Sequence, residues 1–292
     1  MKFDVSIIKG KTVFDLVRAH REKCTQIIQQ AYLAHAAGQS VNPDSYFLQF
    51  PDKPGCRIIA LPAYLGHRFG VAGIKWIASF PANIHHGFPR ASAVLVLNSY
   101  ETGYPFAILE SSIISAARTA ASAALAADWL TGHALRAHSL GIVGTGFIAR
   151  YVYDFLVDGG WAVHELQLHD LSLVEAEKFR NTACRPEHHR TITIVPDISR
   201  LIRACDVIVF TTRQGTHDLW AISPDGSNPR RLTSGGDNQG PTWAPNGRHL
   251  AFQSNRLGRW QVFAMLADGS APAPLTRGQS ESTSPTWSPR LP

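Results

Sequence analysis

The chain has 292 residues, of which 45% are hydrophobic and 17% charged, which indicates a folded protein and excludes an intrinsically disordered one. This length allows two domains of ordinary size. The formal net charge of +6 suits small anionic partners, but Lys and Arg form only short pairs such as Arg230-Arg231, which argues against a nucleic-acid-binding groove.

Cysteine usage and hydropathy indicate a cytoplasmic protein. Cys24, Cys56, Cys184 and Cys205 form no CxxC pair and no spacing typical of metal ligands, so we expect reduced thiols and no metal site. The N-terminal sequence MKFDVSIIKGK lacks the unbroken apolar stretch of a signal peptide. No segment approaches about eighteen consecutive apolar residues, so we expect no membrane partner.

The first elements mix helices with short strands. Residues 13–37 carry apolar side chains at helical spacing and stop at Gly38, which predicts one helix with a left-handed cap. Residues 56–66, 71–81 and 91–109 are β-branched runs separated by turn residues, the last with the form of a hairpin. The Ala-rich residues 111–130 predict a helix that packs closely on both sides.

Residues 138–179 have the order of a βαβ unit: strand, glycine turn, helix, strand, helix. Two further apolar strands, 191–195 and 205–212, flank a short helix at 198–204. This alternation predicts a Rossmann-like parallel sheet with right-handed crossovers.

After Thr212 the alternation stops and a repeat begins. Asp225-Gly226-Ser227 recurs 43 residues later as Asp268-Gly269-Ser270, and PTWAP at 241–245 recurs 44 residues later as PTWSP at 285–289. A period of this length with several short strands is typical of a β-propeller blade. The repeat also relates Arg213 to Arg256, so the strand at 206–212 fits either a blade or the parallel sheet.

The sequence GIVGTGFIAR predicts a dinucleotide site. Gly144, Gly146 and Ala149 give the GxGxxA spacing, which provides a tight turn, close backbone approach to a pyrophosphate and close helix packing. The amides of Thr145, Gly146, Phe147 and Ile148 would face the phosphates. Asp170 ends the next strand, 26 positions after Gly144, where a carboxylate accepts bonds from ribose hydroxyls and repels a 2′-phosphate. We therefore predict NAD rather than NADP; the alternative is a glycine turn that binds no dinucleotide.

Three cations are candidates for a substrate site. Lys75 lies inside an otherwise apolar strand, where a charge needs a partner or a ligand unless the side chain reaches solvent at the strand edge. Arg118, in the Ala-rich helix, suits bidentate binding of a carboxylate; the alternative is an arginine on the helix surface or in a structural ion pair. Arg57 is a third candidate. The pairs His85-His86 and His188-His189 are interpreted as loop residues, because adjacent strand residues point to opposite faces.

The lysine strand, the RTAA helix and the glycine turn, in this order over residues 1–212, resemble the ornithine cyclodeaminase/mu-crystallin family. Within it, the resemblance is to dehydrogenases of siderophore pathways that form 2,3-diaminopropionate, the SbnB type. It implies NAD-dependent oxidation of N-(2-amino-2-carboxyethyl)-glutamate to 2,3-diaminopropionate and 2-oxoglutarate. By resemblance, Lys75 acts near the reacting centre, Arg118 holds a substrate carboxylate and Thr119 contacts NAD.

The resemblance also implies the domain organisation and a homodimer. We expect an α/β fold with an N-terminal α+β dimerisation-type domain at 1–110, an incomplete Rossmann-like NAD domain at 111–212 and about two antiparallel propeller repeats at 213–292. The family continues after Arg213 with more of the nucleotide domain, a catalytic acid and a closing helix, which have no counterpart in this chain. Residues from about Arg213 instead resemble the C-terminal blades of TolB.

The resemblances leave three hypotheses. The chain is a dehydrogenase whose sheet is completed by propeller strands, a noncatalytic TolB-like module that binds a protein partner, or a fusion without function.

Overall fold

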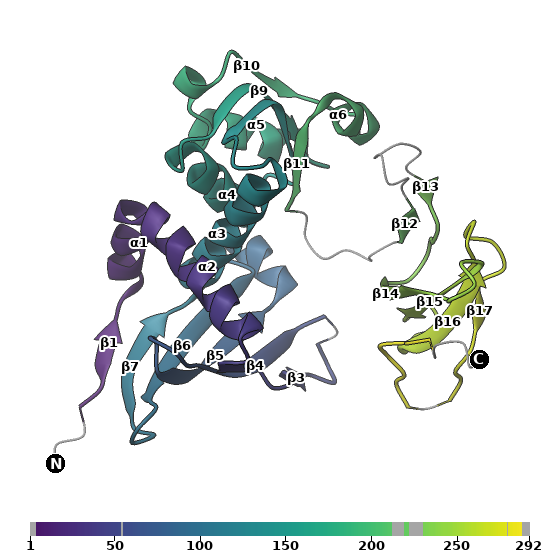
Figure 1. The fold of residues 1–292 in the computed structure, drawn as a ribbon, viewed down its shortest axis with the longest axis horizontal. Coiled ribbons are helices and arrows are strands. Elements are labelled where there is room, and N and C mark those ends of the chain that lie inside the picture. Colours follow the sequence, from purple (N-terminus) through teal and green to yellow (C-terminus); the bar gives the residue numbers. More distant parts are fainter. Residues whose placement is uncertain (1–3, 54, 212–218, 222–229, 279, 288–292) are drawn as a thin grey trace. The chain divides into compact units, whose positions relative to one another are not determined.

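The chain forms two compact units, residues 1–211 and 212–292, in a computed structural model that describes residues 4–53, 55–211, 219–221, 230–278 and 280–287 (Figure 1). The elements of the first unit are β1 (Ser6–Ile8), α1 (Gly10–Ala19), α2 (Arg21–Ala36), β2 (Ser40–Val41), β3 (Tyr46–Gln49), β4 (Arg57–Leu65), β5 (Val71–Ser79), η1 (Pro81–His86), β6 (Ala91–Ser99), β7 (Pro105–Glu110), α3 (Ser112–Leu130), β8 (Arg136–Val143), α4 (Phe147–Asp158), β9 (Ala162–His169), α5 (Leu173–Thr182), η2 (Pro186–His188), β10 (Thr191–Ile194), α6 (Ile198–Ala204) and β11 (Val207–Phe210).

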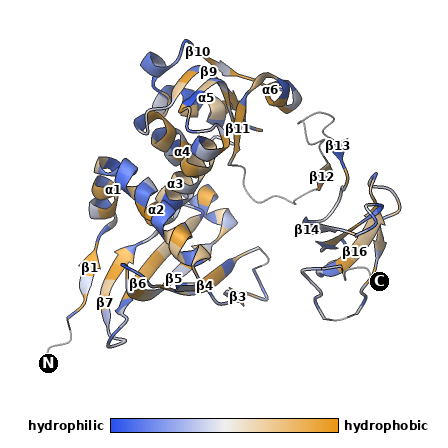
Figure 2. Ribbon diagram, in the orientation of Figure 1, coloured by the Kyte–Doolittle hydropathy of each residue, from blue (hydrophilic) through white to orange (hydrophobic). Residues whose placement is uncertain are grey.

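A seven-stranded sheet forms the N-terminal part, in the order β1-β7-β6-β5-β4-β2, with β3 also paired to β4. All pairs are antiparallel except β1 with β7. Helices α1, α2 and α3 contact this sheet, and Figure 2 shows how apolar its strands are. Ala93 and Ala107 are buried on the helix side, whereas Trp76 and Val94, which point to the opposite face, are 45% and 42% exposed.

The single helix predicted at 13–37 is wrong, because the chain forms two helices, α1 and α2, that meet at His20. The backbone of His20 is non-helical, with φ −136° and ψ 39°. Helix α1 contacts β7 and α3, whereas α2 contacts β4, α3 and α4, so the change of direction lets both helices pack. Apolar periodicity continues through the break and gives no sign of it. Helix α2 ends before Gly38, whose φ of +69° is left-handed as predicted.

The parallel sheet has the order β10-β9-β8-β11, and the mixed α/β class is confirmed. Its core includes the alanine side chains of α3 at positions 116, 120 and 121, which are completely buried. Because these side chains are small, α3 packs against both α2 and α4.

Strand β11, whose sheet the sequence left open, belongs to the parallel sheet. It pairs with β8 in the register Val207↔Leu140 to Phe210↔Val143, and the amide of Thr211 donates to the carbonyl of Val143 at 2.8 Å. The first unit therefore contains the strand that also fits the repeat.

The second unit contains a two-stranded sheet and a four-stranded antiparallel sheet. Leu219, Leu232, Leu250, Phe252 and Phe263 are buried in one cluster. The guanidinium of Arg256 lies over the rings of Phe252 and Phe263, at 5.4 and 5.0 Å from their centroids. The strands are β12 (Trp220–Ala221), β13 (Arg230–Arg231), β14 (Asn238–Trp243), β15 (His249–Ser254), β16 (Gln261–Leu266) and β17 (Ala273–Pro274).

Hydrogen bonds in this unit repeat with the 43-residue period. The hydroxyl of Thr233 accepts from the amide of Leu219 at 2.8 Å, and that of Thr276 accepts from the amide of Val262 at 2.9 Å. The pair β12–β13, with Trp220↔Arg231, corresponds in the same way to β16–β17, with Phe263↔Pro274. Residues 213 and 225–227 of the repeat lie outside the described part of the chain.

Candidate functional site

The predicted glycine turn lies at the carboxyl end of β8, where α4 begins. Gly144 has a φ of +85°, a conformation that favours glycine. Gly146 precedes α4, and a Cβ atom built on it would meet no atom within 4 Å, so the backbone is open to a ligand. No side chain caps α4, and its first turn contains no acidic residue. The free amides at this helix end can therefore bind an anion.

Asp170 lies beside this turn and holds its shape. Its Oδ2 accepts from the amide and hydroxyl of Thr145 at 2.7 and 2.8 Å, and its Oδ1 accepts from the amide of Ser172 at 3.0 Å. Burial opposes ionisation, but these donors outweigh it and hold the pKa of Asp170 below its usual value. The carboxylate is thus charged and has acceptor capacity left for a ribose hydroxyl.

Thr211 is a residue at this turn that sequence reasoning missed. It follows β11, and its hydroxyl donates to the carbonyls of Val143 and Gly144. Only the pairing of β11 with β8 brings Thr211 to the turn, so the sequence carried no signal for it. Ala149, predicted to permit close helix packing, is completely buried.

Lys75 lies on β5 and points toward α3. Its Nζ donates to the hydroxyl of Ser115 at 3.3 Å. Burial, and then the positive charge of Arg118, lower the pKa of Lys75. Among the described residues Lys75 has no carboxylate within ion-pair distance, which fits a cation that awaits an anionic ligand or transfers a proton. Ser115 was missed because one serine in an Ala- and Ser-rich helix gives no signal.

The other residues predicted for the substrate and cofactor sites, Arg118, Arg57 and Thr119, lie on α3 and β4. Arg118 is exposed on α3 and close enough to Lys75 to affect its pKa. Arg57 begins β4, and because Leu61 is opposite Lys75, the alternation of strand side chains puts Arg57 on the same sheet face as Lys75. The hydroxyl of Thr119 donates to the carbonyl of Ser115 at 2.8 Å, one turn earlier in α3. Three cations therefore share the side of the sheet that α3 covers.

Burial governs the environments of His189, Cys184 and Cys205. Nδ1 of His189 donates to the carbonyl of Val163, its Nε2 shares a hydrogen bond with the hydroxyl of Tyr153, and burial lowers the pKa of His189. Burial raises the pKa of the Cys184 thiol to about 12 and that of Cys205 to about 11. In the described ranges no group of three or more His, Cys, Asp or Glu could hold a metal ion. No described helix has the length and apolar character needed to cross a membrane.

Comparisons with known proteins agree with the two resemblances. Alanine dehydrogenase of Archaeoglobus fulgidus is 28% identical over 72% of this chain and 65% of its own length. N-((2S)-2-amino-2-carboxyethyl)-L-glutamate dehydrogenase of Staphylococcus aureus is 38% identical over 44% of this chain and 39% of its own. The Tol-Pal system protein TolB of Geobacter sulfurreducens is 39% identical over 28% of this chain and 19% of its own. Such a combination is consistent with a chimera.

The solved structure of an archaeal alanine dehydrogenase dimer with bound NAD matches 71% of this chain and 60% of its own, with a TM-score of 0.60 and 27% identity. This chain thus spans less than two thirds of the length of these relatives. The model of the ornithine cyclodeaminase/mu-crystallin family matches residues 11–220. The chain therefore belongs to the ornithine cyclodeaminase/mu-crystallin family.

Proposed function

We propose that the first unit binds NAD and is an amino-acid dehydrogenase of this family. The observation that carries the proposal is the open glycine turn at the start of α4, with the charged Asp170 beside it. The amides of Thr145 to Ile148 would hold the pyrophosphate, and Asp170 the adenosine ribose. A 2′-phosphate would meet the Asp170 carboxylate, which favours NAD over NADP.

The cations next to α3 support a substrate with several carboxylates. Arg118 and Arg57 suit bidentate carboxylate binding. NAD, when bound, supplies a hydride acceptor. Lys75, with its lowered pKa, can exchange a proton with the substrate amine or with the water that adds to the oxidised carbon. The substrate we propose is N-(2-amino-2-carboxyethyl)-glutamate, which would be converted to 2,3-diaminopropionate and 2-oxoglutarate, because the S. aureus relative carries this name.

A thermal melt of the full chain with and without NAD tests cofactor binding. NAD at a hundred times its Kd should stabilise the folded site by about 2.7 kcal/mol, and NADP should stabilise it less. The variant Gly146→Asp should lose the shift because it adds a carboxylate at the pyrophosphate position. Gly146→Ala, whose Cβ has open space, checks that the turn still folds. An equal shift in wild type and Gly146→Asp would show that NAD binds elsewhere.

Turnover is tested separately, by NADH formation from the proposed substrate and from alanine. Lys75→Met should abolish NADH formation and keep the NAD-induced shift. If the wild-type chain shows the NAD-induced shift but oxidises neither substrate, it has kept the cofactor binding of this family and not the dehydrogenase reaction.

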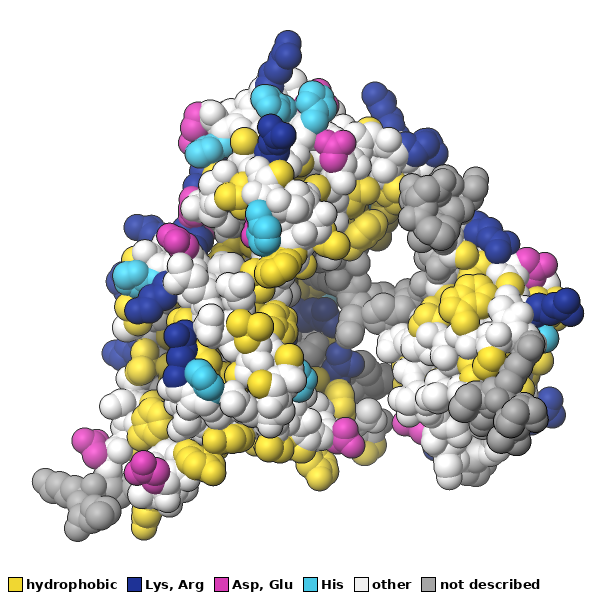
Figure 3. All heavy atoms as spheres, viewed as in Figure 1, with side chains coloured by type: hydrophobic (Ala, Val, Ile, Leu, Met, Phe, Trp, Pro, Cys, Tyr) yellow, Lys and Arg dark blue, Asp and Glu magenta, His cyan; other side chains and the backbone are white. Residues whose placement is uncertain are grey.

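We propose a homodimer for the first unit, through the sheet face that the helices leave uncovered. Tyr46, Trp76 and Val94 lie in one row across β3 to β6 on this face, with Ala60 of β4 between Tyr46 and Trp76, and each of the three is more than two fifths exposed. Hydrophobic side chains also gather along the lower edge of this unit in Figure 3. Contiguous apolar surface of this kind is typical of protein interfaces.

We propose that the second unit is a TolB-like binding module made of parts of two propeller blades. The matched hydrogen bonds of Thr233 and Thr276 support this proposal, because the same contact recurs at the blade period. Thr233→Val and Thr276→Val should each destabilise this unit by about 1–3 kcal/mol, since each leaves an amide without its acceptor. Denaturant unfolding checks this, and a loss confined to one of them would contradict a repeat.

A further inference from the structure

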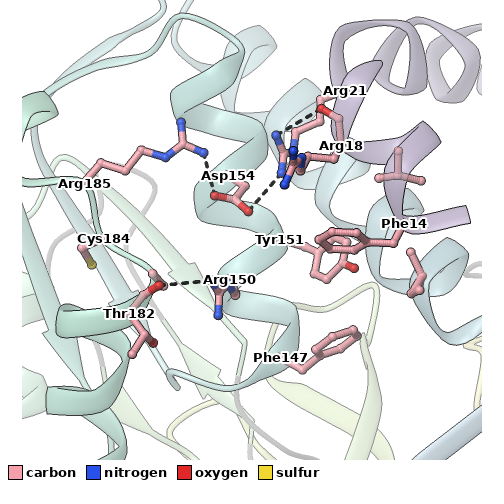
Figure 4. A pocket seen from close by; sticks show the side chains of 13 residues that line it. Phe14, Arg18, Arg21, Phe147, Arg150, Tyr151, Asp154, Thr182, Cys184 and Arg185 are labelled. Atoms are coloured by element: carbon pink, nitrogen blue, oxygen red, sulfur yellow. Dashed lines mark hydrogen bonds and ion pairs between the residues drawn. The ribbon is translucent and has the colours of Figure 1, made fainter. Parts of the chain in front are cut away.

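A cavity of about 920 Å³ lies on the flank of α4 that faces α1 and the end of α5 (Figure 4). Phe147, Arg150, Tyr151 and Asp154 form one wall, because their spacing puts them on one face of α4. Helix α1 provides the other wall. None of Lys75, Arg118, Arg57 and Asp170 lines this cavity. Of the residues proposed to hold NAD only Phe147 lines it, and NAD would use the backbone amide of Phe147, whereas its ring forms part of the cavity wall.

The charges of the cavity do not cancel. Asp154 is held between Arg21 at 3.2 Å and Arg185 at 2.9 Å, and Asp158 also pairs with both arginines. These two carboxylates and two guanidiniums balance one another. Two more cations, Arg18 and Arg150, also line the cavity. In the part of the chain that the structure describes, neither pairs with a carboxylate, and Arg150 donates only to the carbonyl of Thr182, at 3.1 Å.

The rest of the wall combines apolar surface with the hydroxyl of Tyr151. Phe14 and Phe147 line it from opposite sides, and the rings of Phe147 and Tyr151 are tilted with centroids 5.0 Å apart. Tyr151 as a whole is 8% exposed, but its hydroxyl is not fully enclosed, and it forms no hydrogen bond to any described residue. Burial raises the pKa of Tyr151, so the hydroxyl keeps its proton and can donate. The hydroxyl is therefore open to the cavity and can donate to a ligand there.

We propose that this cavity binds a small organic anion, a carboxylate or phosphate that carries an aromatic or other apolar group. Arg18 and Arg150 bind the oxyanion, and Tyr151 donates a hydrogen bond to it. Phe14 and Phe147 pack against the apolar group. The size of the cavity is that of a typical small-molecule site, which is mostly apolar with a few polar groups.

Isothermal titration of the full chain with phenyl phosphate and with inorganic phosphate tests this proposal. Phenyl phosphate should bind at least about tenfold more tightly than phosphate, which corresponds to about 1.4 kcal/mol from the apolar wall. Arg18→Gln and Arg150→Gln should each weaken phenyl phosphate by about tenfold, and Tyr151→Phe by about fivefold. Lys178→Gln, an exposed charge on α5 outside the cavity, is the matched control and should bind as wild type does.

Three results would overturn the proposal. The first is equal binding of both probes, and the second is binding that Arg18→Gln leaves unchanged; the Arg18 side chain forms no hydrogen bond or ion pair with a described residue, so this variant should fold. The third is displacement of phenyl phosphate by saturating NAD, which would put the probe in the glycine-turn site. Retained binding in the presence of NAD supports a separate site.

Discussion

Thr145 and Asp170 show how single residues shape the glycine turn. We predict that Thr145→Val weakens NAD binding by about 1 kcal/mol. Asp170 would keep its hydrogen bond from the backbone amide of residue 145 but lose the hydrogen bond from the hydroxyl, which orients the carboxylate. Titration of NADH fluorescence measures this loss. Thr193→Val, at an exposed position on β10, provides the control, and equal losses in both variants would contradict a specific role for the hydroxyl.

Ser115 and Lys75 give a second prediction at this scale. Ser115→Ala removes the only hydrogen bond that the Lys75 ammonium makes to a described residue, so we expect the pKa of Lys75 to fall further below 10.5. The basic limb of the pH–rate profile should then move to lower pH, with NAD affinity unchanged. A profile that keeps its shape while the rate drops would mean that Ser115 is structural.

Helix α4 is held to α2 and to the segment after α5 by ion pairs. Burial raises the pKa of Asp158, but Arg185 and Arg21 outweigh this and lower it below 3.8. The stabilisation is therefore complete well above pH 3.8 and is lost as the pH falls through the lowered folded-state pKa. Asp158→Asn should cost about 1 kcal/mol at pH 7 and progressively less below about pH 4. Urea unfolding at both pH values measures this; Asp15→Asn, in an exposed pair with Lys11, should show almost no loss.

The elements show what the sequence can and cannot predict. The βαβ strands and the glycine turn were predicted because each has a strong local pattern. The break at His20 was not, since it follows from packing against β7 and β4. The sheet to which β11 belongs depends on its pairing with Leu140 to Val143, which lies far away in the sequence. Likewise Ser115 and Thr211 reach the candidate site only through tertiary contacts.

At the scale of the whole molecule, the two units have separate cores and should unfold separately. Phe252 is completely buried in the second unit, so Phe252→Ala should destabilise that unit by about 3–5 kcal/mol. We expect its calorimetric transition to be lost or shifted down, while the transition that responds to NAD stays in place. A single transition that moves as a whole would show that the units are coupled.

The proposed dimer is also a property of the whole molecule. Trp76→Glu places a charge in the uncovered face of the seven-stranded sheet and should convert the dimer to a monomer in light scattering. Leu173→Glu, the same kind of change at an exposed apolar position on α5, should leave the mass unchanged. A dimer that persists in Trp76→Glu would exclude this face as the interface.

The place of β11 in the first sheet also sets the order in which the chain can fold as it is synthesised. The parallel sheet lacks its last strand until the ribosome has passed Phe210, and the described core of the second unit begins only at Leu219. Each strand that the structure describes pairs only with strands of its own unit. The nascent chain can therefore complete its first unit before the second has emerged, so the later strands do not compete for the edge of β8.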